Sequence, residues 1–343
     1  MNAESLWFTQ SAVSAQAFLP PGDNVAGLLG MAVIGGQALA CGPAGPVPLQ
    51  SVATPLLGTD ALQVESWGVS AACRQGTFQD VRYAASANLL FGVVQLDEAD
   101  VATSAGDAPA LQQIAERAYR QIFALLAQEA CPYLWRVWNY VPDINRIDQG
   151  LERYRQFNIG RHQAFCAFER PVDASPAACA LGVAAGPLSI AFLAARTPAR
   201  QIENPRQVSA FVYPAEYGPR SPTFTRAALA RAGEQSILLI SGTASIVGHQ
   251  TMHQGDVAEQ TRESMRNISV LLAEANRLAG ASLFALDGLV YRVYIRHADD
   301  LDLVRQTLAG IIGSSAVLTF VQADICRADL LVEIEAHGFH LPG

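Results

Sequence analysis

The sequence lacks the segments that mark secreted and membrane-spanning proteins. Its first residues, MNAESLWFTQSAV, contain no basic stretch followed by an apolar core. No later run approaches the roughly 18 consecutive apolar residues that a membrane span requires. We therefore expect a cytoplasmic protein.

Cysteine is scarce and scattered along the chain. The six cysteines show no C-x-x-C spacing and stand at Cys41, Cys73, Cys131, Cys166, Cys179 and Cys326. This pattern is typical of reduced thiols and indicates neither a disulfide framework nor a zinc site. His249 and His253 are four residues apart, but no third metal ligand accompanies them, so we expect no metal.

Charge is also low. Charged residues make up 16% of the chain, and the net charge is −8. An acidic balance disfavours nucleic acid and anionic membranes as partners, although a single pocket can still be basic. Half of the 343 residues are hydrophobic, as in a globular protein, and this length suggests two domains.

The same order of predicted elements occurs twice. Short β segments up to about residue 100, typical of a meandering and largely antiparallel sheet, precede a helix, a strand, a helix and two strands. After residue 200 the order returns, with β segments at 209–217 and 236–248 before two helices and further strands. RQIFALLAQ at 120–128 aligns with RNISVLLAE at 266–274, which supports duplication.

We predict an N-terminal domain at residues 1–200 and a C-terminal domain at residues 201–343.

The last predicted strand, DLLVEIEA, differs most between the repeats. Alternation along a strand places Leu331, Glu333 and Glu335 on one face. In the aligned strand of the first repeat, Ala191 and Leu193 stand in place of the two glutamates. Carboxylates present in one repeat alone indicate a site there, whereas a solvated edge strand is the ordinary explanation of such glutamates.

A basic segment of the first repeat is a candidate binding element. ERYRQFNIGRHQAF, at residues 152–165, contains Tyr154, Arg155 and Arg161. Arginine can bind a carboxylate through two hydrogen bonds, and tyrosine adds a directional donor. The alternative is a solvated helix face whose arginines pair with acids such as Glu152.

A second candidate is the irregular segment YPAEYGPRSPTFTRA, which contains Tyr213 and Arg220. Long irregular stretches of this kind are more often functional than tight turns are. The alternative is a loop that only links the domains.

Small residues form the third candidate. SGTASIVGH places Gly242 and Ala244 directly after a buried strand, where a ligand can approach the backbone closely. Cys326 lies seven residues before Glu333 and could share its pocket, although a lone cysteine is usually an inert small hydrophobe.

These motifs resemble a known family. YGPRSPTFTRA, LLISGTASI, VYRVYIR and VEIEA look like the Rid (YjgF-like) fold, and the whole chain, with NYVPDIN and ERYRQFNIGRHQAF, resembles the chorismatases. The resemblance implies an α+β fold of two Rid-like (chorismate-mutase-like) repeats, each a mixed β-sheet with two helices packed on one face. Rid proteins usually form trimers with sites between subunits.

The resemblance also implies an activity. Glu333 falls on the carboxylate that chorismatases use as the acid, which protonates the enolpyruvyl methylene so that pyruvate is released. Burial against Leu331 and Cys326, or the charge of Glu335, would raise its pKa as required. Simple Rid deaminases carry an arginine where Leu318 stands, which argues against imine hydrolysis.

Chorismate, the implied small-molecule partner, carries two carboxylates. Arg155, Arg161 and Arg220 are available to bind them, and the resemblance requires neither a metal nor an organic cofactor. The chain is expected as a monomer or a small homo-oligomer.

Chorismatases differ in product. In the family, a cysteine seven positions before the acid marks the enzymes that form hydroxybenzoate, and Cys326 stands there, with Ala244 as a second determinant. We therefore expect 3-hydroxybenzoate and pyruvate, or both 3- and 4-hydroxybenzoate. The alternatives are hydrolysis to 3,4-dihydroxycyclohexa-1,5-diene carboxylate, and a Rid-like protein that binds a small acid without turnover.

Overall fold

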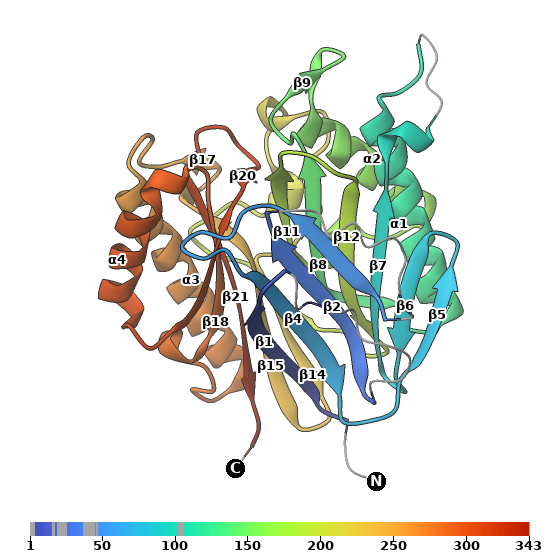
Figure 1. The fold of residues 1–343 in the computed structure, drawn as a ribbon, viewed down its shortest axis with the longest axis horizontal. Helices are drawn as coiled ribbons and strands as arrows, with labels where there is room; N and C mark the ends of the chain where they lie inside the picture. The colour runs from blue at the N-terminus through green and yellow to red at the C-terminus, as the bar shows by residue number, and fades with distance from the viewer. Residues whose placement is uncertain are drawn as a thin grey trace.

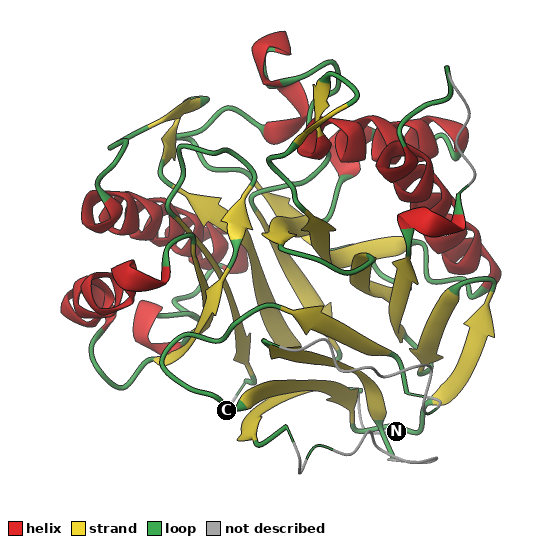
Figure 2. Cartoon of the chain, turned by 45° about the horizontal axis from the view of Figure 1, so that its top comes forward, coloured by secondary structure: helices red, strands yellow, loops and turns green. Residues whose placement is uncertain are grey.

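The computed structural model describes residues 4–15, 18, 26–36, 45, 47–101 and 106–342. Three larger sheets meet in its centre, and the long helices lie at the periphery (Figures 1 and 2). The α-helices among these residues are α1 (Ala110–Gln128), α2 (Arg153–Ala167), α3 (Val257–Ala279) and α4 (Leu301–Ile312). None of the helices in these described ranges is long and apolar enough to cross a membrane.

Each repeat contains one of the two largest sheets. The seven-stranded sheet has the order β20 (Asp324–Ile325), β11 (Ala177–Val183), β8 (Tyr133–Pro142), β12 (Leu188–Ala195), β7 (Leu89–Leu96), β6 (Val81–Ala85) and β5 (Arg74–Phe78). The six-stranded sheet has the order β13 (Arg200–Ile202), β14 (Ala227–Ala232), β15 (Gln235–Ala244), β21 (Val332–His340), β18 (Val290–Ile295) and β19 (Val317–Gln322).

The two sheets share one topology. The order β11-β8-β12-β7-β6 corresponds to β19-β18-β21-β15-β14, and the helices occupy equivalent crossovers. In both sheets the pair joined through the second helix is parallel and the flanking pairs are antiparallel. The predicted α+β fold of two repeats, each a mixed sheet with two helices on one face, is confirmed.

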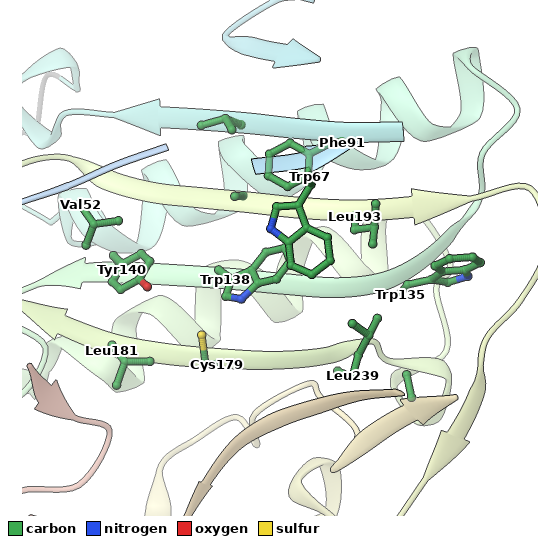
Figure 3. Close-up of a cluster of buried hydrophobic side chains, with 14 of the residues drawn as sticks. Val52, Trp67, Phe91, Trp135, Trp138, Tyr140, Cys179, Leu181, Leu193 and Leu239 are labelled. Atoms are coloured by element: carbon green, nitrogen blue, oxygen red, sulfur yellow. The ribbon is translucent and has the colours of Figure 1, made fainter. Parts of the chain in front are cut away.

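The core has three layers. On the helix-covered faces, Ile122 packs with Phe192 in the first repeat, and Ile268 packs with Ile334 in the second. The opposite faces of both sheets contribute to one shared cluster between the repeats, where Trp138 lies (Figure 3). The residues aligned with the two glutamates, Ala191 and Leu193, also belong to this inner cluster.

The first strands differ from the prediction of one meandering antiparallel sheet. Strands β5 to β7 do form an antiparallel meander within the large sheet. A separate four-stranded sheet has the order β1 (Leu6–Val13), β4 (Leu62–Val69), β2 (Leu28–Gly35) and β3 (Leu49–Ala53), and β2 and β3 are parallel. Trp67 of this sheet packs into the inner cluster, with its ring 5.5 Å from that of Trp138 (Figure 3).

Two further predictions were wrong in detail. Residues 209–217 form the 3₁₀ turns Ala210–Val212 and Ala215–Tyr217 instead of a strand, since local hydrogen bonds such as Val212 N–H to Ser209 O close them at 3.1 Å. The last strand begins at Val332, and the side chain of Leu331 packs on the helix-covered face rather than beside Glu333.

The predicted boundary between residues 200 and 201 falls at β13, and it stays a prediction. Strand β20 of the second repeat pairs with β11 of the first, so the chain crosses between the sheets after this boundary.

Candidate active site

A cavity of about 520 Å³ lies between the two repeats. Its lining includes Cys326, which follows β20, and Ile246 and Gln250 of the hairpin formed by β16 (Ile246–Val247) and β17 (Gln250–Thr251); β17 and β20 are labelled in Figure 1. Of the predicted site residues, eight line it: Tyr154, Arg155, Arg161, Tyr213, Gly242, Ala244, Cys326 and Glu333. The site therefore combines side chains from both repeats.

Glu333 reaches this cavity from the centre of the six-stranded sheet. Its strand neighbours are Ala244 on β15 and Tyr294 on β18. The ladder between β15 and β21 is irregular between Ile240 and Thr243, a bulge that aims the side chains around it. A methyl group on Gly242 would lie 1.9 Å from the Glu333 Oε1 atom, so only glycine leaves room for this carboxyl.

The surroundings of Glu333 favour its acid form. Burial and, to a smaller extent, the negative charge of Glu335 raise the pKa of its carboxyl to about 8, against the opposing charges of Arg136 and Arg226. Within the described residues, neither carboxylate oxygen of Glu333 has a hydrogen-bond partner. A protonated carboxyl at neutral pH is a potential proton donor.

Glu335 lies in the opposite electrostatic environment. Burial alone would raise its pKa, but the guanidinium groups of Arg136 and Arg292 lower it below its usual range. The Arg292 Nη1 atom lies 2.9 Å from Glu335 Oε1, and Arg136 Nη2 donates a hydrogen bond to the other oxygen. Two neighbouring carboxyl groups whose pKa values are pushed apart are typical of catalytic sites.

Three cavity arginines lack a carboxylate partner in the described part of the chain. The sequence contains no lysine, so guanidinium groups supply the fixed positive charge. Arg161, Arg226 and Arg327 each keep a buried N–H without a hydrogen-bond partner. Buried cationic donors of this kind are costly unless an anion binds them, which indicates an anionic ligand.

Other N–H groups of each of these three arginines donate hydrogen bonds that fix the position of the guanidinium. Arg161 donates to Asn158 Oδ1 at 2.8 Å, and Arg226 donates to the Tyr213 hydroxyl at 2.7 Å. Arg327 donates to the His249 carbonyl at 2.8 Å and stacks 3.9 Å from the ring centre of Tyr217. The donors are therefore oriented before any ligand binds.

Among the predicted arginines, Arg220 does not line the cavity. It is exposed in the bend between Pro219 and Pro222. Arg226 lines the cavity instead, and its carbonyl accepts the backbone N–H of Ser241 at 3.0 Å. This hydrogen bond holds Arg226, which directly precedes β14, beside β15.

Arg155 does line the cavity, but it is already engaged. Its Nε atom lies 3.3 Å from a Glu152 oxygen, and its Nη2 atom donates to the Glu216 carbonyl at 3.2 Å. The ion pair with Glu152 that the sequence offered as an alternative is thus present.

Comparisons with known proteins agree on one family. A family model described as the N-terminal part of FkbO/Hyg5-like chorismatases matches residues 65–194. A 3-hydroxybenzoate synthase from Streptomyces hygroscopicus is 39% identical over 228 residues, 64% of this chain and 67% of the relative. A chorismatase from Streptomyces rapamycinicus is 38% identical over 282 residues, 79% of this chain and 80% of the relative. The chain belongs to the chorismatase family.

A solved structure supports the same assignment over nearly the full length. A crystal structure of a chorismatase has a TM-score of 0.85 and 31% identity, and the match covers 98% of this chain and 99% of that one. The protein is accordingly an enzyme.

Small and sulfur-containing residues, among them Ala244, Cys179 and Cys326, form part of the wall of the chorismatase cavity. Burial and, to a smaller extent, the neighbouring Glu333 raise the pKa of the Cys326 thiol to about 12, so the thiol is neutral. Ala244 lies beside the acid in the strand register. Cys179, which sequence reasoning missed, enters from β11, and its Cβ atom would lie 3.1 Å from a methyl on Gly242.

Sequence reasoning also missed Arg327 and the cavity-facing role of Arg226. Arg327 directly follows Cys326, which is the one signal that could have indicated it. Tyr154, which was predicted, lies buried in the wall. Burial raises the pKa of its phenol above the usual range, so it remains a neutral donor.

Proposed function

We propose that the enzyme converts chorismate to 3-hydroxybenzoate and pyruvate, with Glu333 as the proton donor. The observation that carries this proposal is the buried acid form of Glu333 in a cavity with three arginines that lack carboxylate partners. A dicarboxylate would satisfy these arginines while the protonated glutamate adds no repulsion.

The charges suggest how chorismate lies. Its enolpyruvyl carboxylate is attached to the ether carbon, next to the methylene that accepts the proton. Arg226, whose charge acts on Glu333, is the arginine suited to this carboxylate. Arg161 and Arg327 are then available for the ring carboxylate, and the cavity volume of about 520 Å³ suits a ligand of this size.

Proton transfer from Glu333 to the methylene would produce an oxocarbenium ion at the ether carbon. The enol ether is inert before this step, and the three-carbon fragment becomes a leaving group after it. The C4 hydroxyl oxygen would then bond to C3 as the C3–O bond of the ether breaks and pyruvate leaves, and the hydroxyl proton passes to the Glu333 carboxylate. Opening of this oxygen bridge at C4, with transfer of the C3 hydrogen as a proton to the oxygen that stays on C3, makes the ring aromatic and gives 3-hydroxybenzoate. The proton returned to Glu333 restores the acid for the next turnover.

The expected product follows from the cavity walls. Hydroxybenzoate and pyruvate together contain the atoms of chorismate, whereas the dihydroxy acid requires an added water molecule. The neutral thiol of Cys326 and the methyl group of Ala244 offer no strong hydrogen bond to hold a water near the ether carbon. We therefore favour hydroxybenzoate over hydrolysis.

The test is to incubate purified protein with chorismate, assay pyruvate with lactate dehydrogenase, and separate the aromatic products by chromatography. We expect equimolar pyruvate and 3-hydroxybenzoate, with any 4-hydroxybenzoate resolved in the same run. Glu333→Gln should lower kcat by roughly 10²- to 10⁴-fold, the usual contribution of a general acid. Glu234→Gln, an exposed carboxylate in the turn before β15, is the matched control.

The outcomes separate the alternatives. Pyruvate with the dihydroxy acid would replace the proposed product by hydrolysis. Binding of chorismate without pyruvate release would contradict the proposed reaction, and full activity of Glu333→Gln would remove the role proposed for this residue.

A further inference from the structure

Glu335 has a carboxylate that the proposed reaction leaves unused. It lies two residues after Glu333 on β21, so both side chains are on the same face of the sheet. The register places Glu335 opposite Arg292 and Glu333 opposite Tyr294 on β18. Both carboxyl groups are about 95% buried, although only Glu333 lines the large cavity.

Groups from several strands fix the position of Glu335. Arg136 from β8 donates to one carboxylate oxygen, and its Nη1 atom donates to the Ile240 carbonyl at 3.2 Å. The Tyr294 hydroxyl donates to the other oxygen at 3.2 Å. The arrangement joins the two repeats directly across their inner faces.

A second carboxylate completes this arrangement. Glu65 of the four-stranded sheet accepts hydrogen bonds from both Arg292 Nε, at 3.2 Å, and Arg292 Nη2. Burial raises the pKa of Glu65, and the two hydrogen bonds from Arg292 oppose that rise. Arg292 Nη1 also donates to the Tyr140 hydroxyl at 2.8 Å.

Counting charges shows what this cluster does to the acid. Two carboxylates, Glu65 and Glu335, balance two guanidinium groups, Arg136 and Arg292. The buried cluster is therefore neutral while Glu333 is protonated, and ionisation of Glu333 would leave one uncompensated negative charge. Without the charge of Glu335, the cluster would be positive and would stabilise the Glu333 anion instead.

Other titratable or charged groups around Glu333 come from the elements packed against β21. They are Tyr154 and Arg161 on α2, Cys179 on β11, Arg226 ahead of β14, and Cys326 beside β20. The tyrosine and the two thiols are neutral at physiological pH, and Arg226, like Arg136, favours the Glu333 anion. Glu335 is thus the anion in direct range that opposes those arginines.

We propose that Glu335 is a positioning residue, an anion held by Arg136 and Arg292 that keeps Glu333 in its acid form. The inference rests on the proposed function, in which Glu333 donates a proton to the substrate. Glu335 itself does not line the cavity and acts only through Glu333.

The test is the pH profile of kcat/KM for chorismate. Activity of the wild type falls as pH rises through the pKa of Glu333, since the acid form is then lost. In Glu335→Gln this fall should move to lower pH by about one unit or more, because the like charge is gone and the arginines remain. Glu335→Asp keeps the charge, and its fall should stay near the wild-type position.

A matched control separates this role from a structural one. Glu263 on α3 is also buried and is paired with Arg206 and Arg266, but it lies outside the cavity. Glu263→Gln should lower thermal stability without moving the pH profile. An unchanged profile in folded Glu335→Gln, or an equal shift in Glu263→Gln, overturns the proposal.

Two further measurements keep the proposal testable. If Glu335→Gln does not fold, Arg136→Gln is used instead. Loss of this positive charge should move the decrease in kcat/KM to higher pH, and an unchanged pH profile overturns the proposal. Titration of the Glu333 carboxyl by ¹³C NMR, assigned with Glu333→Gln, needs no turnover. Absence of pyruvate release would therefore reject the proposed function alone. The role of Glu335 would be rejected if the Glu333 carboxyl titrated with the same midpoint in the wild type and in Glu335→Gln.

Discussion

Glu333 combines a catalytic requirement with a thermodynamic cost. In the unfolded chain its pKa returns to the ordinary value of 4.5, whereas burial raises it to about 8 in the folded protein. A folded-state pKa above the unfolded one means that stability is fully present below pH 4.5 and is lost as pH rises through 8. The buried carboxyl of Glu333, which is the proposed acid, therefore destabilises the fold at neutral and basic pH.

This cost can be measured with Glu333→Gln. The amide cannot ionise, so the variant should gain stability over the wild type by about 1.4 kcal/mol per pH unit between the two pKa values, and less where relaxation lowers the cost. Urea unfolding at pH 5, 7 and 9 provides the free energies. A difference that does not grow with pH would contradict the buried acid.

Glu263→Gln is the control of opposite sign. Burial opposes ionisation of Glu263, but hydrogen bonds from Arg266 and Arg206 lower its pKa below the ordinary value. Its carboxylate therefore stabilises the fold above that value. Glu263→Gln should lose stability at neutral pH, and the loss should shrink as pH falls.

At the scale of elements, the segment between β20 and β21 connects the two repeats. It carries Cys326 and Arg327 into the cavity without regular structure of its own. The guanidinium of Arg296 holds this segment through the carbonyls of Leu330, Ile325 and Arg327 at 2.8, 3.2 and 2.9 Å. One side chain thus replaces the hydrogen bonds that a strand would supply.

Arg296→Lys tests this arrangement. Lysine keeps the charge but cannot reach several carbonyls through a planar fork, so the segment should loosen. We expect KM for chorismate to rise about tenfold, as for a loss of roughly 1.4 kcal/mol in positioning. Steady-state kinetics measure the effect, and Arg277→Lys on the exposed face of α3 serves as control. Unchanged KM and product would show that the segment holds its shape without Arg296.

At the scale of the whole molecule, the four-stranded sheet closes the space between the repeats. Gln235 on β15 pairs with the backbone of Leu6 on β1, accepting its N–H at 3.0 Å and donating to its carbonyl at 3.0 Å. Leu6 is buried, so both backbone groups depend on this amide. The first strand is thereby attached to the last repeat.

Gln235→Ala should weaken this attachment. Two buried backbone groups lose their partner, which should lower the free energy of unfolding by about 1–3 kcal/mol. Because the amide is remote from the cavity, kcat of the folded variant should equal that of the wild type. Urea unfolding and the pyruvate assay test both statements together, with the exposed Gln128→Ala as control. A stable variant, or an inactive folded one, would contradict this account.

The sequence by itself determined the repeated order of elements, because apolar periodicity and turn residues act over short distances along the chain. It also determined the asymmetry at Glu333 and Glu335, which a comparison with Ala191 and Leu193 reveals without coordinates. The segments 209–217 and 329–331 escaped prediction, since their hydrogen bonds lie in local turns or with distant side chains.

Only the tertiary structure decided which charges meet. Glu65 and Arg292 are 227 positions apart in the chain, and no local pattern predicts their ion pair. Arg226 and Arg220 are similar as sequence, yet one faces the cavity and the other faces solvent. The reason is physical: burial and Coulomb interactions depend on distance in space, so the acid state of Glu333 exists only where three sheets close around it.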